Sequence, residues 1–371
     1  MPCTDDRNSA GRLTVDLDAL VRNYRAIAAR TAPVPVAAVV KADAYGLGAA
    51  PIAAALAAAG CRHFFVAHLL EARRLKDRLP NDADLFVLNG LTPGAEAEAA
   101  DLGVIPVLNT LPQVRAWTAL AAERGGVLPA AIQLDSGMSR LGLAPAELDA
   151  LLAEPVLLSR LDLRLVMSHL ACGDAADGVA SAEQLAAFLT QADRLPTAPR
   201  SLSNSAGSFL DARFHFDLVR PGLALYGAEP HEVPGRALEP VVSLQARIIQ
   251  LREVPAGARI GYGYSFEAPR PMRLATIGIG YADGWPRALS NRGAAWRGEA
   301  RLPIVGRVSM DSTILDISAL PADALVEGDD VELIGLHQSL DAVAAAAGSI
   351  THEILTGLGP RLHRSYHGTQ S

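Results

Sequence analysis

The sequence predicts an α/β protein in which a (β/α)8 barrel of the TIM type precedes a mostly β C-terminal domain. Short apolar runs alternate with helical stretches over about 210 residues, as parallel strands and their crossover helices do in such barrels. The alternation stops near Pro230, and residues 231–235 have the composition of a linker. Strand-like runs separated by glycine and proline follow. We therefore expect a barrel over residues 12–235 and a second domain over residues 236–371.

The predicted barrel begins with a helix over residues 16–30, with Asp18 as its N-cap. Eight apolar runs of strand length lie at 34–40, 64–68, 84–90, 104–108, 130–135, 164–169, 200–204 and 218–225. Stretches with helical spacing lie between them, at 48–59, 69–79, 94–101, 112–123, 145–152 and 181–194. This alternation is what a closed parallel barrel requires.

The second domain is predicted to be built mainly from strands, at 241–251, 273–281, 301–308, 312–317 and 330–334. Only residues 340–347 and 350–357 have a helical pattern there. Residues 13–15 are strand-like but precede the barrel's first strand. We therefore expect residues 12–16 to pair with the C-terminal domain.

The composition limits the classes of partner. The chain has 371 residues, of which 50% are hydrophobic and 20% charged, so it can bury a large core. A formal net charge of -7 argues against nucleic acid or an anionic membrane as the main partner. Three cysteines, with no Cys/His cluster at zinc spacing, predict neither a disulfide framework nor a metal site. The N-terminal residues lack the apolar core of a signal peptide, and we expect a cytoplasmic protein.

Lys41 stands where an apolar, partly β-branched run over residues 35–40 ends. An ammonium at the end of a buried strand loses hydration, which lowers its pKa. Such a lysine can attack a carbonyl and form a Schiff base. Tyr45, Gly46 and Gly48 follow, and they offer a hydroxyl and open backbone N–H groups that suit a phosphate. The pattern indicates an aldehyde cofactor that carries a phosphate, although a strand-end lysine can also extend to water.

Four further polar or glycine-rich segments stand at predicted strand ends. Residues 135–140 follow the fifth strand, His169 ends the sixth, residues 203–207 follow the seventh, and residues 220–222 lie in the last. The carboxyl ends of barrel strands share one face, where active sites lie. Each segment alone is compatible with a turn or a packed residue. Their common position is the stronger indication of a site.

These segments together resemble the alanine racemases, a family of fold-type III enzymes that use pyridoxal 5′-phosphate. The resemblance extends over nearly the whole chain and keeps the order of the motifs. It rests on residues 38–48, 135–142, 167–169, 203–205 and 220–227, and in the second domain on residues 261–263, 278–284 and 306–311.

The resemblance implies two catalytic residues. Lys41 would hold the cofactor as a Schiff base and, once released by an incoming amino acid, act as a base on one face of its Cα. Tyr262 would act on the opposite face and would come from the second subunit of a head-to-tail homodimer. Two bases on opposed faces meet the requirement of racemisation, because a proton leaves on one side and returns on the other. A tyrosine between two glycines is, by itself, equally compatible with packing.

The resemblance also implies how cofactor and substrate are held. Arg220 would face the pyridine nitrogen, where its permanent charge disfavours protonation and so limits side reactions such as transamination. By itself, Arg220 is also compatible with a structural salt bridge. Arg140 would reach the cofactor's phenolic oxygen and the substrate carboxylate. The remaining implied contacts are His169 against the cofactor ring, Tyr45, Ser205 and the N–H groups of Gly222 and Leu223 on the phosphate, and Tyr281 and the Met310 backbone of the second subunit on the carboxylate.

Two positions depart from the family pattern. Members commonly have a lysine at the position of Gln133, modified to a carbamate that orients the arginine. A glutamine cannot be carbamylated, so we expect Gln133 to hydrogen-bond Arg140 directly, or a bound anion such as chloride to take the carbamate's place. The family often has a tyrosine near Pro360 that contacts phosphate, and the Pro360 side chain cannot make that contact.

The expected activity is the interconversion of L-alanine and D-alanine, which supplies D-alanine for peptidoglycan or serves its catabolism. Three alternatives are open. A racemase of broader or serine-type specificity is compatible with the variant position Gln133. A fold-type III amino-acid decarboxylase is disfavoured by Tyr262 and by residues 280–284. A non-catalytic pyridoxal-phosphate carrier is disfavoured by the predicted second domain.

Overall fold

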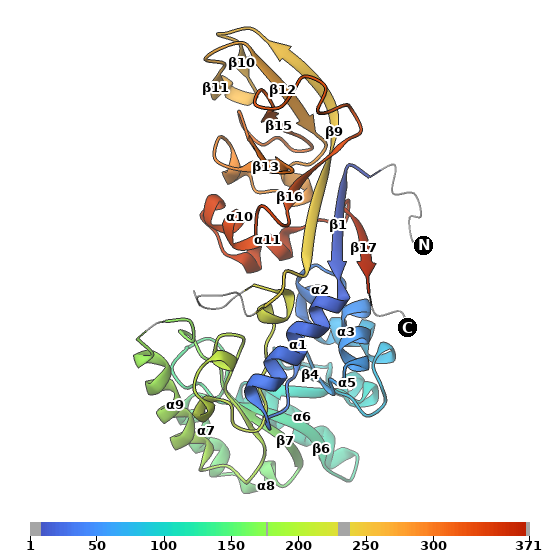
Figure 1. The fold of residues 1–371 in the computed structure, drawn as a ribbon. Helices are drawn as coiled ribbons and strands as arrows, with labels where there is room; N and C mark the ends of the chain where they lie inside the picture. Colours follow the sequence, from blue (N-terminus) through green and yellow to red (C-terminus); the bar gives the residue numbers. More distant parts are fainter. Residues whose placement is uncertain (1–8, 176, 229–237, 369–371) are drawn as a thin grey trace.

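The protein is described here by a computed structural model that covers residues 9–175, 177–228 and 238–368. The first eight residues, the expected linker at 231–235 and the expected boundary after residue 235 therefore lie outside the described residues. Figure 1 shows the barrel in its lower half and the strand-rich C-terminal part in its upper half. The N-terminal strand β1 (Gly11–Asp16) belongs to the upper half.

Seven parallel strands follow one another in chain order around the barrel. They are β2 (Ala38–Val39), β3 (His63–Val66), β4 (Asp84–Val87), β5 (Ile105–Leu108), β6 (Leu128–Gln133), β7 (Leu161–Met167) and β8 (Arg200–Ser201). The eighth position is taken by a single parallel bridge between Val219 and Val36. The Ala37 N–H donates to the Val219 carbonyl at 2.8 Å, and the Asp217 N–H donates to the Arg200 carbonyl at 3.0 Å. These bonds connect β8 to β2 and close the barrel.

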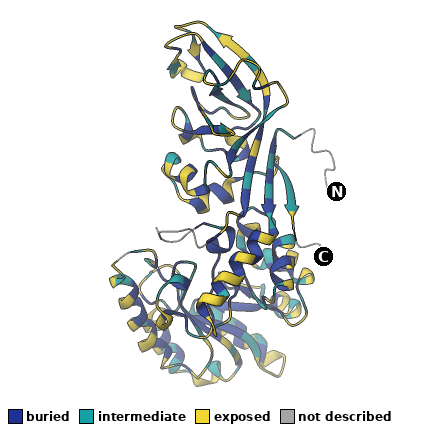
Figure 2. Ribbon diagram, viewed as in Figure 1, coloured by how far each residue is buried: buried dark blue, intermediate teal, exposed yellow. Residues whose placement is uncertain are grey.

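Helices surround this barrel on its outer side (Figure 1). They are α1 (Leu17–Thr31), α3 (Ala49–Ala58), α4 (Leu69–Leu75), α5 (Glu96–Leu102), α6 (Leu111–Glu123), α7 (Pro145–Leu152), α8 (Pro155–Leu158) and α9 (Val179–Ala192). Figure 2 shows exposed and buried residues alternating along helices such as α1, which buries one side of its surface against the core. None of the described helices is both long and apolar enough to cross a membrane.

The C-terminal part is built on one eight-stranded sheet with the order β14-β13-β16-β9-β1-β17, to which β12 and β15 are added through β9. The strands are β9 (Val242–Val254), β12 (Met272–Ile277), β13 (Ala294–Arg297), β14 (Ala300–Pro303), β15 (Thr313–Asp316), β16 (Asp330–Ile334) and β17 (His363–His367). A small pair, β10 (Arg259–Ile260) with β11 (Phe266–Glu267), and the helices α10 (Leu340–Ala347) and α11 (Thr351–Gly357) complete it.

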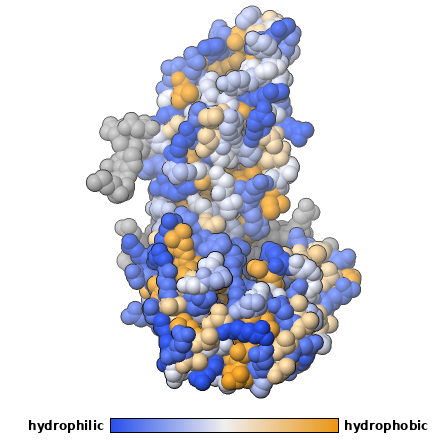
Figure 3. Space-filling model, turned by 180° about the vertical axis from the view of Figure 1, so that it is seen from behind, coloured by the Kyte–Doolittle hydropathy of each residue, from blue (hydrophilic) through white to orange (hydrophobic). Residues whose placement is uncertain are grey.

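Residues 12–16, for which the sequence predicts pairing with the C-terminal strands, lie in β1. This strand pairs antiparallel with β9, with Leu13 opposite Leu244, and parallel with β17, with Leu13 opposite Arg364. The two ends of the chain are therefore joined in one sheet. The face in Figure 3 carries hydrophobic residues scattered among hydrophilic ones. In β1, and in the first half of β9, every second residue is buried, so one face of these strands packs in the core.

The structure corrects three expectations about the elements. The helix N-cap is Asp16, whose Oδ1 accepts from the Ala19 N–H at 2.8 Å, and Asp18 lies in the first turn. The run 218–225 is not one strand, because Pro221 lacks an N–H and the short helix η5 (Leu223–Tyr226) follows Gly222. Strands β13 and β17 were not predicted, since β13 has only four residues and the residues of β17 are mostly polar.

Leu13 offers a test of the strand that joins the chain ends. Its side chain is fully buried in β1 between β9 and β17. Replacing it by alanine is expected to lower the free energy of unfolding by about 2–5 kcal/mol, because a buried cavity remains. The matched control is Leu336→Ala, since Leu336 is 89% exposed; its expected effect is within about 0.5 kcal/mol. Equal effects of both substitutions in denaturant unfolding would contradict this account.

Candidate active site

A cavity of about 760 Å³ opens at the carboxyl ends of the barrel strands. This size is typical of small-molecule sites. The opposite wall belongs to the C-terminal part, with Ile350, Thr351 and His352 at the start of α11. Eight of the residues singled out in the sequence line the cavity: Lys41, Tyr45, Arg140, His169, Ser205, Arg220, Gly222 and Leu223. Segments far apart in the chain thus converge at one place.

Lys41 opens a single turn of left-handed helix, α2 (Lys41–Tyr45). The φ angles of the four residues from Ala42 to Tyr45 lie between 52° and 59°. Each such residue costs roughly 1–2 kcal/mol relative to the right-handed form, because Cβ approaches the next carbonyl oxygen. Strained backbone of this kind persists only where the surrounding structure holds it.

Three side chains stabilise the left-handed turn, Glu71 and Arg364 from other elements and Asp43 from within the turn. Glu71 of α4 accepts from the Ala42 N–H at 2.8 Å, and the same carboxylate accepts from the Ala67 N–H at 2.7 Å. Asp43 accepts from the Ala49 N–H at 2.7 Å. Arg364 of β17 donates through Nε to the Gly46 carbonyl at 3.1 Å. The direction of Lys41 is therefore set by the barrel and by the C-terminal sheet together.

The environment of Lys41 lowers the pKa of its amine. Burial is the largest cause, because it penalises the charged form, and the positive charge of Arg140 adds to it. The carboxylate of Glu71 opposes this effect and raises the pKa by a smaller amount. Lys41 therefore carries a larger fraction of neutral, nucleophilic amine at a given pH than a solvated lysine.

A small cradle of backbone N–H groups lies beside Tyr45. The Ser205 hydroxyl accepts from the Gly222 N–H at 2.9 Å and from the Ala224 N–H at 3.2 Å. A Cβ at Gly222 would lie only 2.2 Å from the Tyr45 hydroxyl, so glycine is required for this approach. Burial raises the pKa of Tyr45, which keeps the phenol protonated as a donor. A hydroxyl pair and clustered N–H groups suit an anionic oxygen such as a phosphate.

Arg220 is 3% exposed and forms no ion pair with any carboxylate in the part of the chain that is described. Its guanidinium donates to the Ser168 carbonyl at 2.7 Å and to the Ser201 hydroxyl. Burial lowers the pKa of Arg220 to about 9, which leaves it a cation near neutral pH. The structural salt bridge considered as an alternative is thus absent from the described residues.

His169 lies in the same cavity as a neutral ring. Burial, with Arg220, Arg140 and Lys41 as further causes, lowers the pKa of His169 to about 3. The ring therefore stays uncharged throughout the physiological range of pH. The Gln184 side chain holds the backbone of His169, donating to its carbonyl at 3.0 Å.

Arg140 lines the cavity from an exposed loop after β6. Asp135 shapes this loop, because its Oδ1 accepts from the N–H groups of Gly137 at 2.9 Å and Ser139 at 3.0 Å. Gln133 is buried in β6, and no hydrogen bond joins its side chain to Arg140. The expected direct bond is therefore absent, since the arginine leaves the strand for the exposed loop.

Three of the singled-out residues do not line this cavity. Tyr262, Tyr281 and Met310 lie in the C-terminal part and are 72%, 42% and 53% exposed. Tyr262 belongs to the short helix η6 (Tyr262–Tyr264) and Tyr281 to η7 (Tyr281–Asp283). Pro360 also lies outside the lining of the cavity. One chain therefore brings together eight of the predicted residues and leaves the other three at its surface.

Comparison with known proteins identifies the family of this arrangement. A family model for the alanine racemase N-terminal domain matches residues 15–230, and one for the C-terminal domain matches residues 241–366. The chain belongs to the alanine racemase family. An alanine racemase from Brucella suis is 53% identical over 98% of this chain and 95% of its own length. A protein named "Alanine racemase, catabolic" from Agrobacterium fabrum is 53% identical over 96% of this chain and 92% of its own length.

Solved structures of the family share the fold. The alanine racemase of Bartonella henselae, described with covalently bound pyridoxal phosphate, superposes with a TM-score of 0.94. It is 46% identical, and the match covers 97% of this chain and all of that one. The alanine racemase of Streptomyces coelicolor superposes with a TM-score of 0.91 at 31% identity, over 97% of this chain and 99% of that one. The (β/α)8 barrel followed by a mostly β domain is thus the fold of this family.

Glu71 and Arg364, which stabilise the left-handed turn after Lys41, were not predicted from the sequence. Both contact the lysine turn only after segments distant in the chain have folded together. A carboxylate in the first turn of a predicted helix was the sole available signal for Glu71, and such carboxylates are common.

The lowered pKa of Lys41 can be tested by selective acylation, because the chain has only one other lysine, Lys76. On protein treated with hydroxylamine to remove carbonyl compounds, a limiting acylating reagent at about pH 8 is expected to modify Lys41 faster than Lys76. A lower pKa leaves more neutral amine at that pH. Peptide mass spectrometry gives both rates. Slower modification of Lys41 across the range of about pH 7–9 would contradict the electrostatic account.

Proposed function

We propose that this chain is an alanine racemase that uses pyridoxal 5′-phosphate to interconvert L-alanine and D-alanine. The observation that carries the proposal is that Lys41 and Arg220 line the same cavity. Arg220 is buried there, and no carboxylate of the described residues pairs with it. Pyridoxal phosphate, when bound, withdraws electrons from the Cα of an amino acid and acidifies its hydrogen. The roles below are those that the residues of this chain would have around it.

The lining residues fit such a cofactor. Lys41 is the amine to which it would be attached, and its lowered pKa favours attack on a carbonyl. The Tyr45 and Ser205 hydroxyls, with the N–H groups of Gly222 and Leu223, would hold its phosphate. The close approach of Gly222 to Tyr45 supports this assignment, because any side chain at that position would displace the hydroxyl.

Arg220 would control the electronic character of the ring. A guanidinium only donates hydrogen bonds, and it stays charged at the pKa of about 9 that burial gives it. Beside a pyridine nitrogen it disfavours a second positive charge. The neutral His169 would lie against the ring without adding charge. Together they would restrict the reaction to removal and return of one proton.

Two bases on opposite faces of the substrate would move that proton. Lys41, freed from the cofactor, would serve one face as an amine of lowered pKa. Tyr262 of the partner subunit would serve the other face. Support comes from the exposure of Tyr262, Tyr281 and Met310, which a lone chain leaves outside its own cavity. We therefore propose a homodimer in which each subunit completes the other's site.

Arg140 would bind the substrate carboxylate, together with Tyr281 and the Met310 backbone of the partner subunit. Since Gln133 makes no hydrogen bond to Arg140, we propose that a small anion such as chloride lies between them and orients the guanidinium. We also propose that the enzyme acts in the cytoplasm. The D-alanine would serve peptidoglycan or catabolism, and the relatives carry both the plain and the catabolic name.

Tyr262→Phe tests the two-base assignment. The purified holoenzyme is expected to turn L-alanine into a mixture of both enantiomers, which chiral chromatography detects. The same assay with L-serine as the substrate tests for broader specificity. The kcat of the Tyr262→Phe variant is expected to fall at least about 10²-fold, because phenylalanine cannot act as the second base. It should keep the visible absorbance of the bound cofactor. Tyr264→Phe, on the same exposed turn, is the matched control and should stay near wild type. Full activity of Tyr262→Phe refutes the assignment.

Gly222→Ala tests the phosphate cradle. The new methyl group would lie 2.2 Å from the Tyr45 hydroxyl, so either the tyrosine or the backbone must move. Cofactor affinity, measured by titrating the cofactor-free protein with pyridoxal phosphate, is expected to fall by about 10-fold or more, the effect of losing one hydrogen bond to a charged group. Gly126→Ala is the control, because nothing lies within 4 Å of its added carbon. Unchanged cofactor affinity in Gly222→Ala would contradict the assignment of phosphate binding to this cradle.

A further inference from the structure

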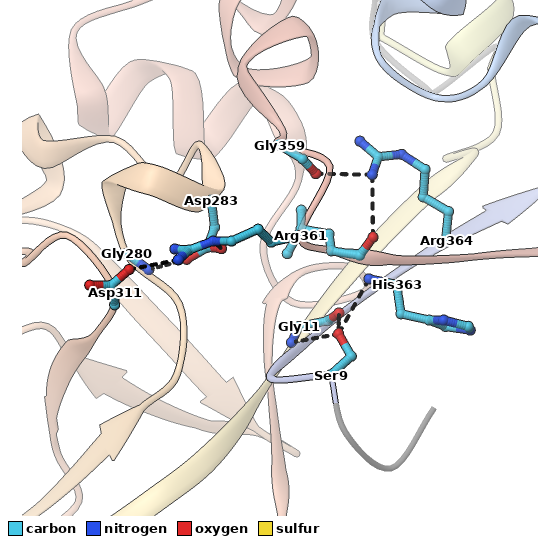
Figure 4. A network of polar contacts seen from close by, with 10 residues as sticks. Ser9, Gly11, Gly280, Asp283, Asp311, Gly359, Arg361, His363 and Arg364 are labelled. Atoms are coloured by element: carbon cyan, nitrogen blue, oxygen red, sulfur yellow. Dashed lines mark hydrogen bonds and ion pairs between the residues drawn. The ribbon is translucent and has the colours of Figure 1, made fainter. Parts of the chain in front are cut away.

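Arg361 joins two surface loops of the C-terminal part (Figure 4). Its Nε donates to Asp283 Oδ1 at 2.8 Å, and its Nη1 donates to Asp311 Oδ1 at 2.7 Å. Asp283 is buried, whereas Asp311 is mostly exposed. The second oxygen of Asp283 accepts from the Gly280 N–H at 2.9 Å. One guanidinium thus bridges two carboxylates that stand 28 residues apart in the sequence.

The two bridged loops are those that carry Tyr281 and Met310. Backbone bonds run directly between them, from the Tyr281 N–H to the Ser309 carbonyl and from the Ala282 N–H to the Met310 carbonyl, both at 2.9 Å. A Cβ at Gly280 would lie 2.3 Å from the Ser309 oxygen, so the two loops pack backbone to backbone. Asp283 lies two residues after Tyr281, and Asp311 directly follows Met310.

The segment that carries Arg361 also holds the lysine turn. Arg364 donates to the carbonyls of Leu358 and Gly359, both at 2.9 Å, and through Nε to the Gly46 carbonyl at 3.1 Å. The Gly359 N–H in turn donates to the Asp283 carbonyl at 2.9 Å. Figure 4 shows Arg361 and Arg364 reaching in different directions from this stretch, Arg361 toward the two aspartates.

We propose that Arg361 is a positioning residue that acts on the neighbouring subunit's reaction: it fixes the loops that present Tyr281 and Met310 to the amino-acid carboxylate bound in the partner's site. The inference rests on the proposed function and its shared sites. Arg361 itself touches no reacting atom. The planar guanidinium suits this role because its fork reaches two carboxylates at once, which the single ammonium of a lysine cannot do with the same geometry.

Arg361→Gln separates positioning from stability. KM for L-alanine is expected to rise about 10-fold while kcat falls by less than about threefold, because uniform binding of the carboxylate is lost. Hydrogen exchange at the Tyr281 and Ala282 amides, measured on cofactor-free protein, is expected to become faster. Asp311→Asn removes only the exposed carboxylate and should move KM in the same direction, which keeps the test valid if Arg361→Gln folds poorly.

Arg297→Gln is the matched control, because Arg297 also lies in the C-terminal part and pairs with an aspartate, Asp329, at 3.6 Å. KM should stay at the wild-type value in this control. All variants are compared at one subunit concentration, with the dimer measured by size-exclusion chromatography. Unchanged KM and amide exchange in both Arg361→Gln and Asp311→Asn would overturn the proposal.

Mixed dimers decide in which subunit Arg361 acts. In one mixed dimer, one chain carries Lys41→Ala and the other carries Arg361→Gln. The one site that keeps Lys41 then receives unaltered loops from the Lys41→Ala chain, so its KM should be that of the wild type. In the other mixed dimer, one chain carries both changes and its partner is wild type. The one site that keeps Lys41 then receives the loops of the Arg361→Gln chain, so its KM should be raised. Reversed or equal KM values overturn the proposal. Absence of racemisation by the wild-type dimer would instead refute the proposed function.

Discussion

The left-handed turn after Lys41 is the constraint on which the site depends. Its four residues with positive φ are unfavourable by themselves, so contacts from elsewhere must hold them. Glu71 of the barrel and Arg364 of the C-terminal sheet supply those contacts. Arg364 is itself placed by the pairing of β17 with β1, which precedes the whole barrel in the chain. The direction of one side chain therefore depends on a sheet that joins both ends of the molecule.

Electrostatics then gives the cavity its chemistry. Lys41, Arg140 and Arg220 line it together, and neither of the lining carboxylates, Asp174 and Asp341, forms an ion pair with them. Such a surplus of positive charge favours a phosphate and a carboxylate as ligands. Burial and the charge of Arg140 depress the pKa of Lys41, and burial with the charges of Arg220, Arg140 and Lys41 depresses the pKa of His169. One arrangement thus accounts both for binding of anions and for an amine that can act as a base.

The sequence predicts those features that depend on local pattern. The barrel strands were identifiable because buried parallel strands form short apolar runs. The polar segments at their ends, together with the resemblance to the alanine racemases, marked eight residues of the cavity. The edge strand β17 was missed because its residues are polar and only partly buried. The absent bond between Gln133 and Arg140 and the contacts of Glu71 and Arg361 depend on distances between separate loops. No spacing along the chain encodes those distances.

The central claim is that a complete site needs Lys41 of one subunit and Tyr262 of the other. The most direct measurement mixes the Lys41→Ala and Tyr262→Phe proteins, each inactive alone, after dissociation and reassembly. Random pairing gives one intact site in each mixed dimer, so about a quarter of the wild-type racemase activity is expected to return. No recovery, with mixed dimers demonstrated by native mass spectrometry, would contradict the account.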